Sequence, residues 1–349
     1  MDSNGNSNGN GKDRGRYAAL SPVACAEPGM APMAAARGEL IVVNKLAGRV
    51  QFFDARTQAL LAEIEMAKFP HEVVLSPDRS KAYVSIYGQG VFGKNSEAPG
   101  REVAIIDLAG RRQIGAIDVS PYRAPHGMAF DGAGVLWVSC DLSGVILAVD
   151  VERRAVIAAV ETGSFGTHWL TVLASRGKLY ATNKHYDFVA VIDTAARAMK
   201  TRIPFPQGSE GLALSPDGTR LFVMAQRPQQ FHVIDTGSDA VVDVVPLDVF
   251  AATPEGRNPQ KRVQVSPDGS HLLITSFDTG EIAIAPLSDL RSQTRLAVEK
   301  GPMGITFADA ATAYVMNHDQ GTISVINVPG RRILSTFATA RGPETLAVF

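Results

Sequence analysis

The chain has 349 residues, of which 45% are hydrophobic and 20% are charged, and its formal net charge is −1. This composition is typical of a globular protein with a large core, and it excludes a strong global field that would attract nucleic acid or an anionic membrane. No run approaches the roughly 18 apolar residues of a membrane span, and the first residues lack an apolar signal core, so we expect a cytoplasmic protein that binds neither nucleic acid nor membranes.

The beginning of the chain differs in composition from the rest. Residues 1–37 are rich in Ser, Asn, Gly, Ala and Pro without a helix or strand period, which predicts a disordered tail. Cys25 in this tail and Cys140 in an apolar run are the only cysteines, so we expect reduced thiols rather than a disulfide framework.

Residues 38–349 have the pattern of an all-β domain. Runs of five to seven Val, Ile, Leu, Phe and Tyr residues are separated by "SPD", "DG" and "G", and no long stretch has a helical period. Aligned on "LSPD" and its equivalents, the first strand of each unit starts at His71, His126, His168, Glu210, Lys261, Met303 or Glu344. The steps between them are 55, 42, 42, 51, 42 and 41 residues. A period just over 40 residues with four short strands indicates propeller blades.

The second and third strands repeat in the same way. Examples of the second strand are "LIVVN" at 40–44 and "AYVMN" at 313–317, and "FVAVID" at 188–193 is typical of the third. The N-terminal unit has no first strand of its own, and "PETLAVF" at 343–349 supplies one. The sequence therefore predicts a seven-bladed β-propeller with four antiparallel strands per blade, closed by strands from both ends of the domain.

The repeated motifs "P-H/x-G-x-A-x-S-P-D-G", "L-Y-V-x-N" and "V-x-V-I-D" resemble the YVTN-repeat propellers over about residues 39–349. That superfamily includes lactonase-like propellers, the muconate-lactonizing propeller of fungi, streptogramin lyases and the haem-binding propeller of nitrite reductase. The resemblance implies the fold, and by analogy it favours an enzyme. No catalytic motif of these families can be transferred residue by residue, because the shared motifs mark strands and turns.

The seven first-strand starts form a predicted ring at one mouth of the channel. The six polar members are candidate catalytic residues: His71, His126, His168, Glu210, Lys261 and Glu344. The first four of these, in consecutive blades, could bind one divalent ion such as zinc, iron, manganese or magnesium. They could also act as a general acid and base without metal, or each histidine could simply bind a loop carbonyl.

Other polar residues are placed near the same mouth. Next to the ring, Glu72, Trp169 and Arg262 could contact a substrate, although Trp169 could instead pack between blades. A predicted basic arc that could bind an anion lies three residues before the ring positions; its members are Lys68, Arg123, Lys300 and Arg341. The turns after the second strands add Tyr87, Asp141, His185 and His318 as candidate substrate contacts. Insertions at 87–102 and 246–260 are predicted to overhang the mouth.

These features predict an enzyme that acts on a small anionic or lactone-bearing molecule by hydrolysis, elimination or isomerisation. Two alternatives remain at this point: a scaffold propeller without catalysis, and a redox protein with iron or copper held by histidines. We expect no haem, because "CxxCH" is absent, and no nucleotide. The sequence does not predict an oligomeric state.

Overall fold

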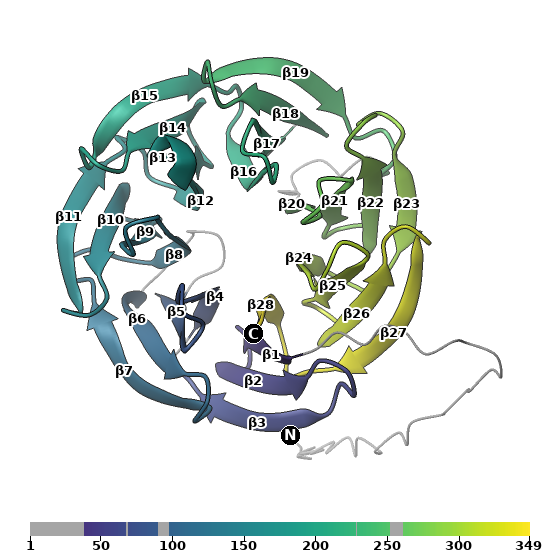
Figure 1. Ribbon diagram of the computed structural model, residues 1–349, viewed down its shortest axis with the longest axis horizontal. Helices are drawn as coiled ribbons and strands as arrows, with labels where there is room; N and C mark the ends of the chain where they lie inside the picture. Colours follow the sequence, from purple (N-terminus) through teal and green to yellow (C-terminus); the bar gives the residue numbers. More distant parts are fainter. Residues whose placement is uncertain (1–37, 68, 90–97, 228, 252–260) are drawn as a thin grey trace, which may run out of the picture. The chain divides into compact units, whose positions relative to one another are not determined.

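Seven four-stranded antiparallel sheets surround a central channel in the computed structural model, which describes residues 38–67, 69–89, 98–227, 229–251 and 261–349 (Figure 1). The predicted all-β, seven-bladed propeller is confirmed. The tail predicted at 1–37 lies outside the described residues. Within the described ranges, no helix is long and apolar enough to span a membrane.

Each blade runs outward from an inner strand beside the channel to an outer strand at the rim (Figure 1). The first complete blade contains β4 (Pro70–Leu75), β5 (Lys81–Gly88), β6 (Pro99–Asp107) and β7 (Arg112–Asp118). The second contains β8 (Pro125–Phe130), β9 (Leu136–Cys140), β10 (Val145–Asp150) and β11 (Ala155–Glu161). The third contains β12 (Thr167–Leu173), the 3-10 turn η1 (Ala174–Arg176), β13 (Lys178–Asn183), β14 (Phe188–Asp193) and β15 (Ala198–Pro204).

The remaining blades follow the same order. The fourth contains β16 (Ser209–Leu214), β17 (Arg220–Ala225), β18 (Gln230–Asp235) and β19 (Ala240–Pro246). The fifth contains β20 (Val263–Val265), β21 (His271–Ser276), β22 (Glu281–Pro286) and β23 (Thr294–Ala297). The sixth contains β24 (Pro302–Phe307), β25 (Thr312–Asn317), β26 (Thr322–Asn327) and β27 (Arg332–Ala338).

The seventh blade joins the two ends of the domain, as predicted. It contains β28 (Pro343–Val348), β1 (Glu39–Asn44), β2 (Arg49–Asp54) and β3 (Leu60–Glu65). Strand β28 pairs with β1 in the register Leu40↔Val348 and Val42↔Leu346. This pairing hydrogen-bonds the inner edge of β1 and closes the ring without an open sheet edge between first and last blades.

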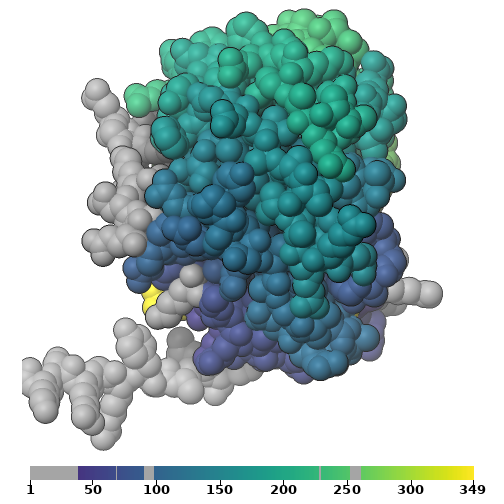
Figure 2. Space-filling model, turned by 90° about the vertical axis from the view of Figure 1, so that its left-hand side faces the viewer, coloured from purple at the N-terminus to yellow at the C-terminus, as the bar shows by residue number. Residues whose placement is uncertain are grey.

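The core lies between blades rather than within one of them. The two middle strands of each blade are buried on both faces, and side chains from adjacent blades meet in apolar clusters. Phe222 and Phe231 of the fourth blade, for example, cluster with Leu272 and Ile274 of the fifth. From the side that carries β7, β11 and β15, neighbouring blades form a continuous wall (Figure 2). Burial on two faces explains why the middle strands are continuous apolar runs.

The two predicted insertions are only partly described. Strand β5 extends to Gly88, which pairs with Pro99 of β6, and β19 ends at Pro246 before a turn at 247–250. Residues 90–97 and 252–260 lie outside the described residues. The prediction that these insertions overhang the mouth therefore stays a prediction.

Candidate functional site

The ring residues lie together because the inner strands are bulged where they begin. Six of the seven occupy the second position of an inner strand, and Lys261 precedes β20. Pairing in β4 is interrupted between Pro70 and Val73, and pairing in β12 between Thr167 and Leu170. Such bulges leave residues unpaired and redirect their side chains. All seven ring side chains are buried, with at most 5% of each residue exposed.

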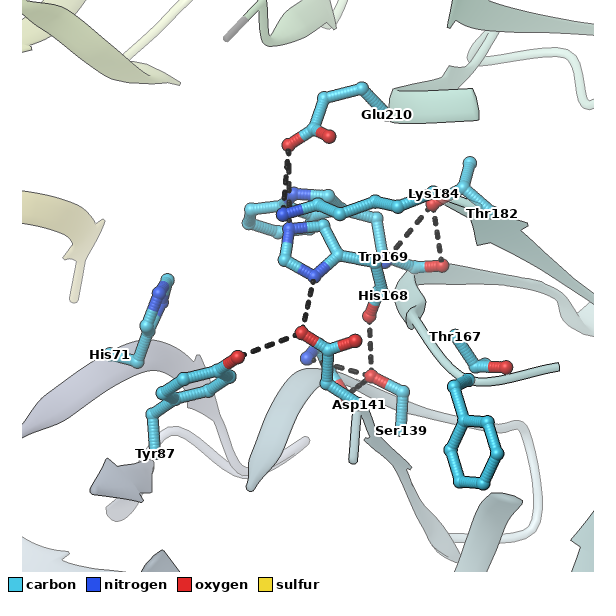
Figure 3. A network of polar contacts seen from close by, with 12 residues as sticks. His71, Tyr87, Ser139, Asp141, Thr167, His168, Trp169, Thr182, Lys184 and Glu210 are labelled. Atoms are coloured by element: carbon cyan, nitrogen blue, oxygen red, sulfur yellow. Dashed lines mark hydrogen bonds and ion pairs between the residues drawn. The ribbon is translucent and has the colours of Figure 1, made fainter. Parts of the chain in front are cut away.

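Hydroxyl groups on the second strands stabilise these bulges in four blades. In each case the hydroxyl oxygen accepts the backbone N–H of the residue after the ring position. The pairs are Ser85 with Glu72 (3.1 Å), Ser139 with Gly127 (2.9 Å), Thr182 with Trp169 (3.1 Å) and Thr275 with Arg262 (3.0 Å). The Ser139 hydroxyl also donates to the His168 carbonyl of the next blade (Figure 3). The backbone of the ring is therefore fixed both within and between blades.

The rings of the three predicted histidines lie next to one another, with tilted planes. The ring centroids of His71 and His126 are 4.2 Å apart, and those of His126 and His168 are 3.6 Å apart. Burial, followed by the charges of Lys45 and Arg262, holds the pKa of His71 well below its ordinary value. Burial and the two flanking imidazoles also hold the pKa of His126 well below its ordinary value. Both groups are therefore neutral near pH 7.

His168 lies between two carboxylates (Figure 3). Its Nδ1 is 3.5 Å from Oδ2 of Asp141, and its Nε2 is 3.4 Å from Oε1 of Glu210. The Tyr87 hydroxyl donates to the same Asp141 oxygen at 2.9 Å, and Lys184 Nζ lies 3.6 Å from Glu210 Oε1. Burial alone would raise the pKa of Asp141, but the contacts with His168, Lys184 and Tyr87 outweigh it and hold that pKa at about 2.

Arg262 lies on the other side of the cluster. Its Nη2 is 3.1 Å from Oε1 of Glu72 and 2.9 Å from Oε1 of Glu344, and its Cζ lies 4.3 Å from the Trp169 ring centroid. Burial raises the pKa of Glu72 to about 8 in spite of Arg262. For Glu344, Lys45 and Arg262 outweigh burial and lower the pKa. His318 joins this group, with its Nε2 3.4 Å from Oε2 of Glu344.

Two cavities follow one another along the channel. The polar pocket, of about 10 Å³, is bordered by His71, His168, Glu210, Glu344, Tyr87, Lys45, Lys184 and Arg262. The channel cavity, of about 130 Å³, is bordered by residues further along the inner strands, including Trp169, Leu212 and Ile305. Arg262 borders both. The polar pocket has the size of about one water molecule, so only the channel cavity has room for the bulk of a ligand.

Glycine at the position after the ring serves packing between blades. A Cβ on Gly211 would lie 2.8 Å from the carbonyl oxygen of Lys261 in the next blade. That distance is shorter than van der Waals contact, so a larger residue would force the two inner strands apart. Close approach of neighbouring inner strands therefore requires glycine here.

The residues present fit a divalent cation. His71, Glu72 and His126 are buried and offer ligand atoms that all lie within 4.8 Å of one another. Two imidazoles and one carboxylate are donors used for zinc and iron. Both ring nitrogens of His126 lack a hydrogen-bond partner within the described chain. Two of the four ligands predicted from the sequence, His71 and His126, belong to this group, whereas His168 and Glu210 do not. Arg262 contacts the same Glu72 oxygen as His71.

The other predicted site residues are distributed unevenly. Lys68 lies outside the described residues, and the three remaining members of the basic arc, Arg123, Lys300 and Arg341, are exposed and border neither cavity. His185 is also exposed. Lys261 is buried, its Nζ has no hydrogen-bond partner in the described ranges, and burial lowers its pKa to about 8. A role for the basic arc stays a prediction.

Lys45 and Lys184, which were not selected from the sequence, are the lysines of the polar pocket. They follow β1 and β13 in the equivalent sequences "VVNK" and "ATNK". Repetition of the dipeptide "NK" at the same position of two blades was the available signal. Together with Arg262, these lysines bring positive charge to the histidine and glutamate cluster.

No family model matches the chain, and no curated protein does. Solved structures share the fold. A chain of hydrazine synthase from Kuenenia stuttgartiensis has a TM-score of 0.68 and 18% identity over 91% of this chain and 99% of its own. The periplasmic gluconolactonase of Pseudomonas aeruginosa has a TM-score of 0.72 and 18% identity over 89% and 99%. A protein of unknown function from Desulfotomaculum acetoxidans has a TM-score of 0.69 and 12% identity over 89% and 98%. At these identities the likeness concerns the seven-bladed fold.

Proposed function

We propose that the protein is an enzyme that transfers protons on a small anionic or lactone-bearing molecule, with His168 as the general acid and base. The observation that carries this proposal is the position of His168 between Asp141 and Glu210 in a buried pocket. A carboxylate 3.5 Å from Nδ1 stabilises the protonated form of the imidazole through its charge, and Nε2, which faces Glu210 in the pocket, is the atom to which we assign the proton exchange.

Hydrolysis of a lactone illustrates the chemistry. His168 Nε2 removes a proton from water while the water oxygen bonds to the lactone carbonyl carbon. The ring C–O bond then breaks, and the proton passes from Nε2 to the leaving oxygen, which gives a hydroxy acid. Lys45, Lys184 and Arg262 offset the negative charge of the intermediate and of the product. Elimination and isomerisation would use the same proton transfer. The fold shared with a gluconolactonase favours lactones as the first substrates to test.

The reaction is tested with a panel of γ- and δ-lactones, by following acid release with a pH indicator in weak buffer. We expect turnover by the native protein and a loss of at least about 100-fold in His168→Gln, because general acid and base catalysis contributes that much or more. The matched control is His271→Gln, which changes a histidine bonded to Ser270 in a turn. Equal rates in the native protein and in His168→Gln would overturn the proposal.

A metal-dependent version is favoured by one observation, the buried group of His71, Glu72 and His126. When bound there, a divalent ion would supply a Lewis acid for a substrate oxygen. Metal content of the purified protein, measured before and after treatment with a chelator, separates the two versions. Activity that falls with the metal and returns when it is added supports the metal-dependent version, and activity unaffected by complete removal contradicts it.

A further inference from the structure

The channel cavity is lined like a binding site for a small molecule, and its lining has no role in the proposed proton transfer. Its border includes Trp169, Arg262 and apolar residues of four other blades. The apolar set includes Leu212, Ile305, Met316 and Leu346. A few polar groups at one end of an apolar pocket are typical of sites for small molecules.

The size of the cavity limits its ligand to a small body. Its volume of about 130 Å³ is close to that of a buried protein cavity that accepts benzene, which is about 150 Å³. A single six-membered ring therefore matches the space. The indole of Trp169 offers such a ring an aromatic surface.

The channel cavity also has a route to solvent away from the polar pocket. The inner strands β4 and β8 are buried over their first three residues and partly exposed over their last three. Gln264, three positions after the ring residue of its blade, is exposed and borders the cavity. A ligand can therefore enter from the end of the channel opposite the histidines.

Arg262 determines which charge the ligand carries. Its contacts with Glu72 and Glu344 within the described chain both use Nη2. A guanidinium has five N–H donors, so its Nη1 edge is available for a further acceptor. The Arg262 side chain is 10% exposed, whereas those of Glu72 and Glu344 are 5% and 2% exposed. A carboxylate matches this geometry because it accepts two parallel N–H bonds from arginine.

We propose that the channel cavity binds a small planar carboxylate of about the size of benzoate. Its ring lies among the apolar walls beside Trp169, and its carboxylate binds the free edge of Arg262. The carboxylate end then faces the polar pocket, where Arg262 also contacts the glutamates. As a statement about the substrate this inference rests on the proposed function, whereas binding itself requires no catalysis.

Calorimetric titration with benzoate and with benzamide tests the inference, because the two molecules have nearly the same shape and differ in charge. We expect benzoate to bind at least about tenfold more tightly, since a hydrogen bond between two charged partners is stronger than one to a neutral amide. Equal affinity for the two, or no binding of benzoate, would overturn the inference.

A variant at the open end tests the location. Gln264→Phe replaces an amide by a bulkier aromatic ring at an exposed border position of the cavity, and we expect it to weaken benzoate binding at least about tenfold by occupying the space. Gln113→Phe on the outer strand β7 is the matched control and should bind like the native protein. Unchanged affinity in Gln264→Phe would contradict the location.

A crystal structure with 4-bromobenzoate locates the ligand without any variant. The anomalous signal of bromine is expected between Trp169 and Ile305, and a signal only outside the channel would contradict the inference. The outcomes also separate the two proposals. Lactone turnover that depends on His168 without benzoate binding would remove only this inference, whereas benzoate binding without turnover of any lactone would remove the proposed function.

Discussion

Arg262 joins the fifth blade to the strand that closes the ring, because its Nη2 lies 2.9 Å from Oε1 of Glu344. Both side chains are buried, and the same nitrogen reaches Glu72 in the first blade. One guanidinium therefore connects three blades across the channel. The native ion pair need not add stability, but removing one partner leaves a buried charge without compensation.

Arg262→Leu should lower the free energy of unfolding by about 3 to 5 kcal/mol, the usual cost of breaking a buried pair. Urea unfolding followed by circular dichroism measures this loss. The matched control is Arg291→Leu, because Arg291 pairs with Asp243 at 2.7 Å but on the exposed surface. That change should cost at most about 1 kcal/mol. Equal losses in the two variants would contradict the role given to Arg262.

Lys261 should make stability depend on pH. Its pKa is lowered by burial from 10.5 to about 8, so the folded protein favours the neutral amine. This contribution to stability is present above pH 10.5 and is lost as the pH falls through about 8. Lys261→Met removes the charge, and at pH 7 it should raise the free energy of unfolding by roughly 2 to 3 kcal/mol.

The pH dependence of the stability of Lys261→Met checks this explanation. The difference between Lys261→Met and the native protein should shrink as the pH rises from about 8 to 10.5. Lys178 is also buried, but its Nζ lies 2.7 Å from Asp239, so Lys178→Met should destabilise the protein at every pH in this range. A Lys261→Met variant that is less stable than the native protein at pH 7 would disprove the argument.

The repeat explains why the fold was predictable. Each blade presents the same order of apolar runs and turns, so the sequence predicted all seven inner strands, each starting at its ring residue, and six of them start one residue earlier. It also placed β28 beside β1, because a unit without an inner strand needs one. The start of β20 differs most, since this strand begins two positions after Lys261.

The site was less predictable, because side-chain direction and reach do not follow from a repeat. The histidines are adjacent in the ring, and the sequence placed them together. The basic arc was selected because it lies at the start of the inner strands, yet Arg123 and Arg341 are exposed. Lys184 is buried beside Glu210 because its turn directs it into the channel. The contact between Arg262 and Glu72 across the channel depends on the channel diameter, which cannot be predicted from the repeat.

Removal of residues 343–349 should eliminate soluble folded protein. These residues form β28, and without them the inner edge of β1 is unpaired. Apolar side chains such as Ile41 and Val43 also lose their packing against residues of this segment. The fraction of soluble protein and its urea midpoint measure the effect. A truncated chain that unfolds at the native midpoint would contradict the closure of the ring.

Tyr87→Phe tests whether Tyr87 positions the proposed catalytic pair. The change removes one hydroxyl that donates to Asp141 at 2.9 Å and keeps the ring, whose centroid lies 5.2 Å from that of His71. Loss of this donor should raise the pKa of Asp141 from about 2, because burial is then less fully opposed. With a lactone that the native protein hydrolyses, we expect kcat to fall about tenfold and the acid limb of the pH profile to move to higher pH. Tyr186→Phe, at an exposed tyrosine near β14, is the matched control and should change neither quantity. A purely structural role for Tyr87 would lower stability and leave the acid limb in place, and that result would separate Tyr87 from the chemistry of His168.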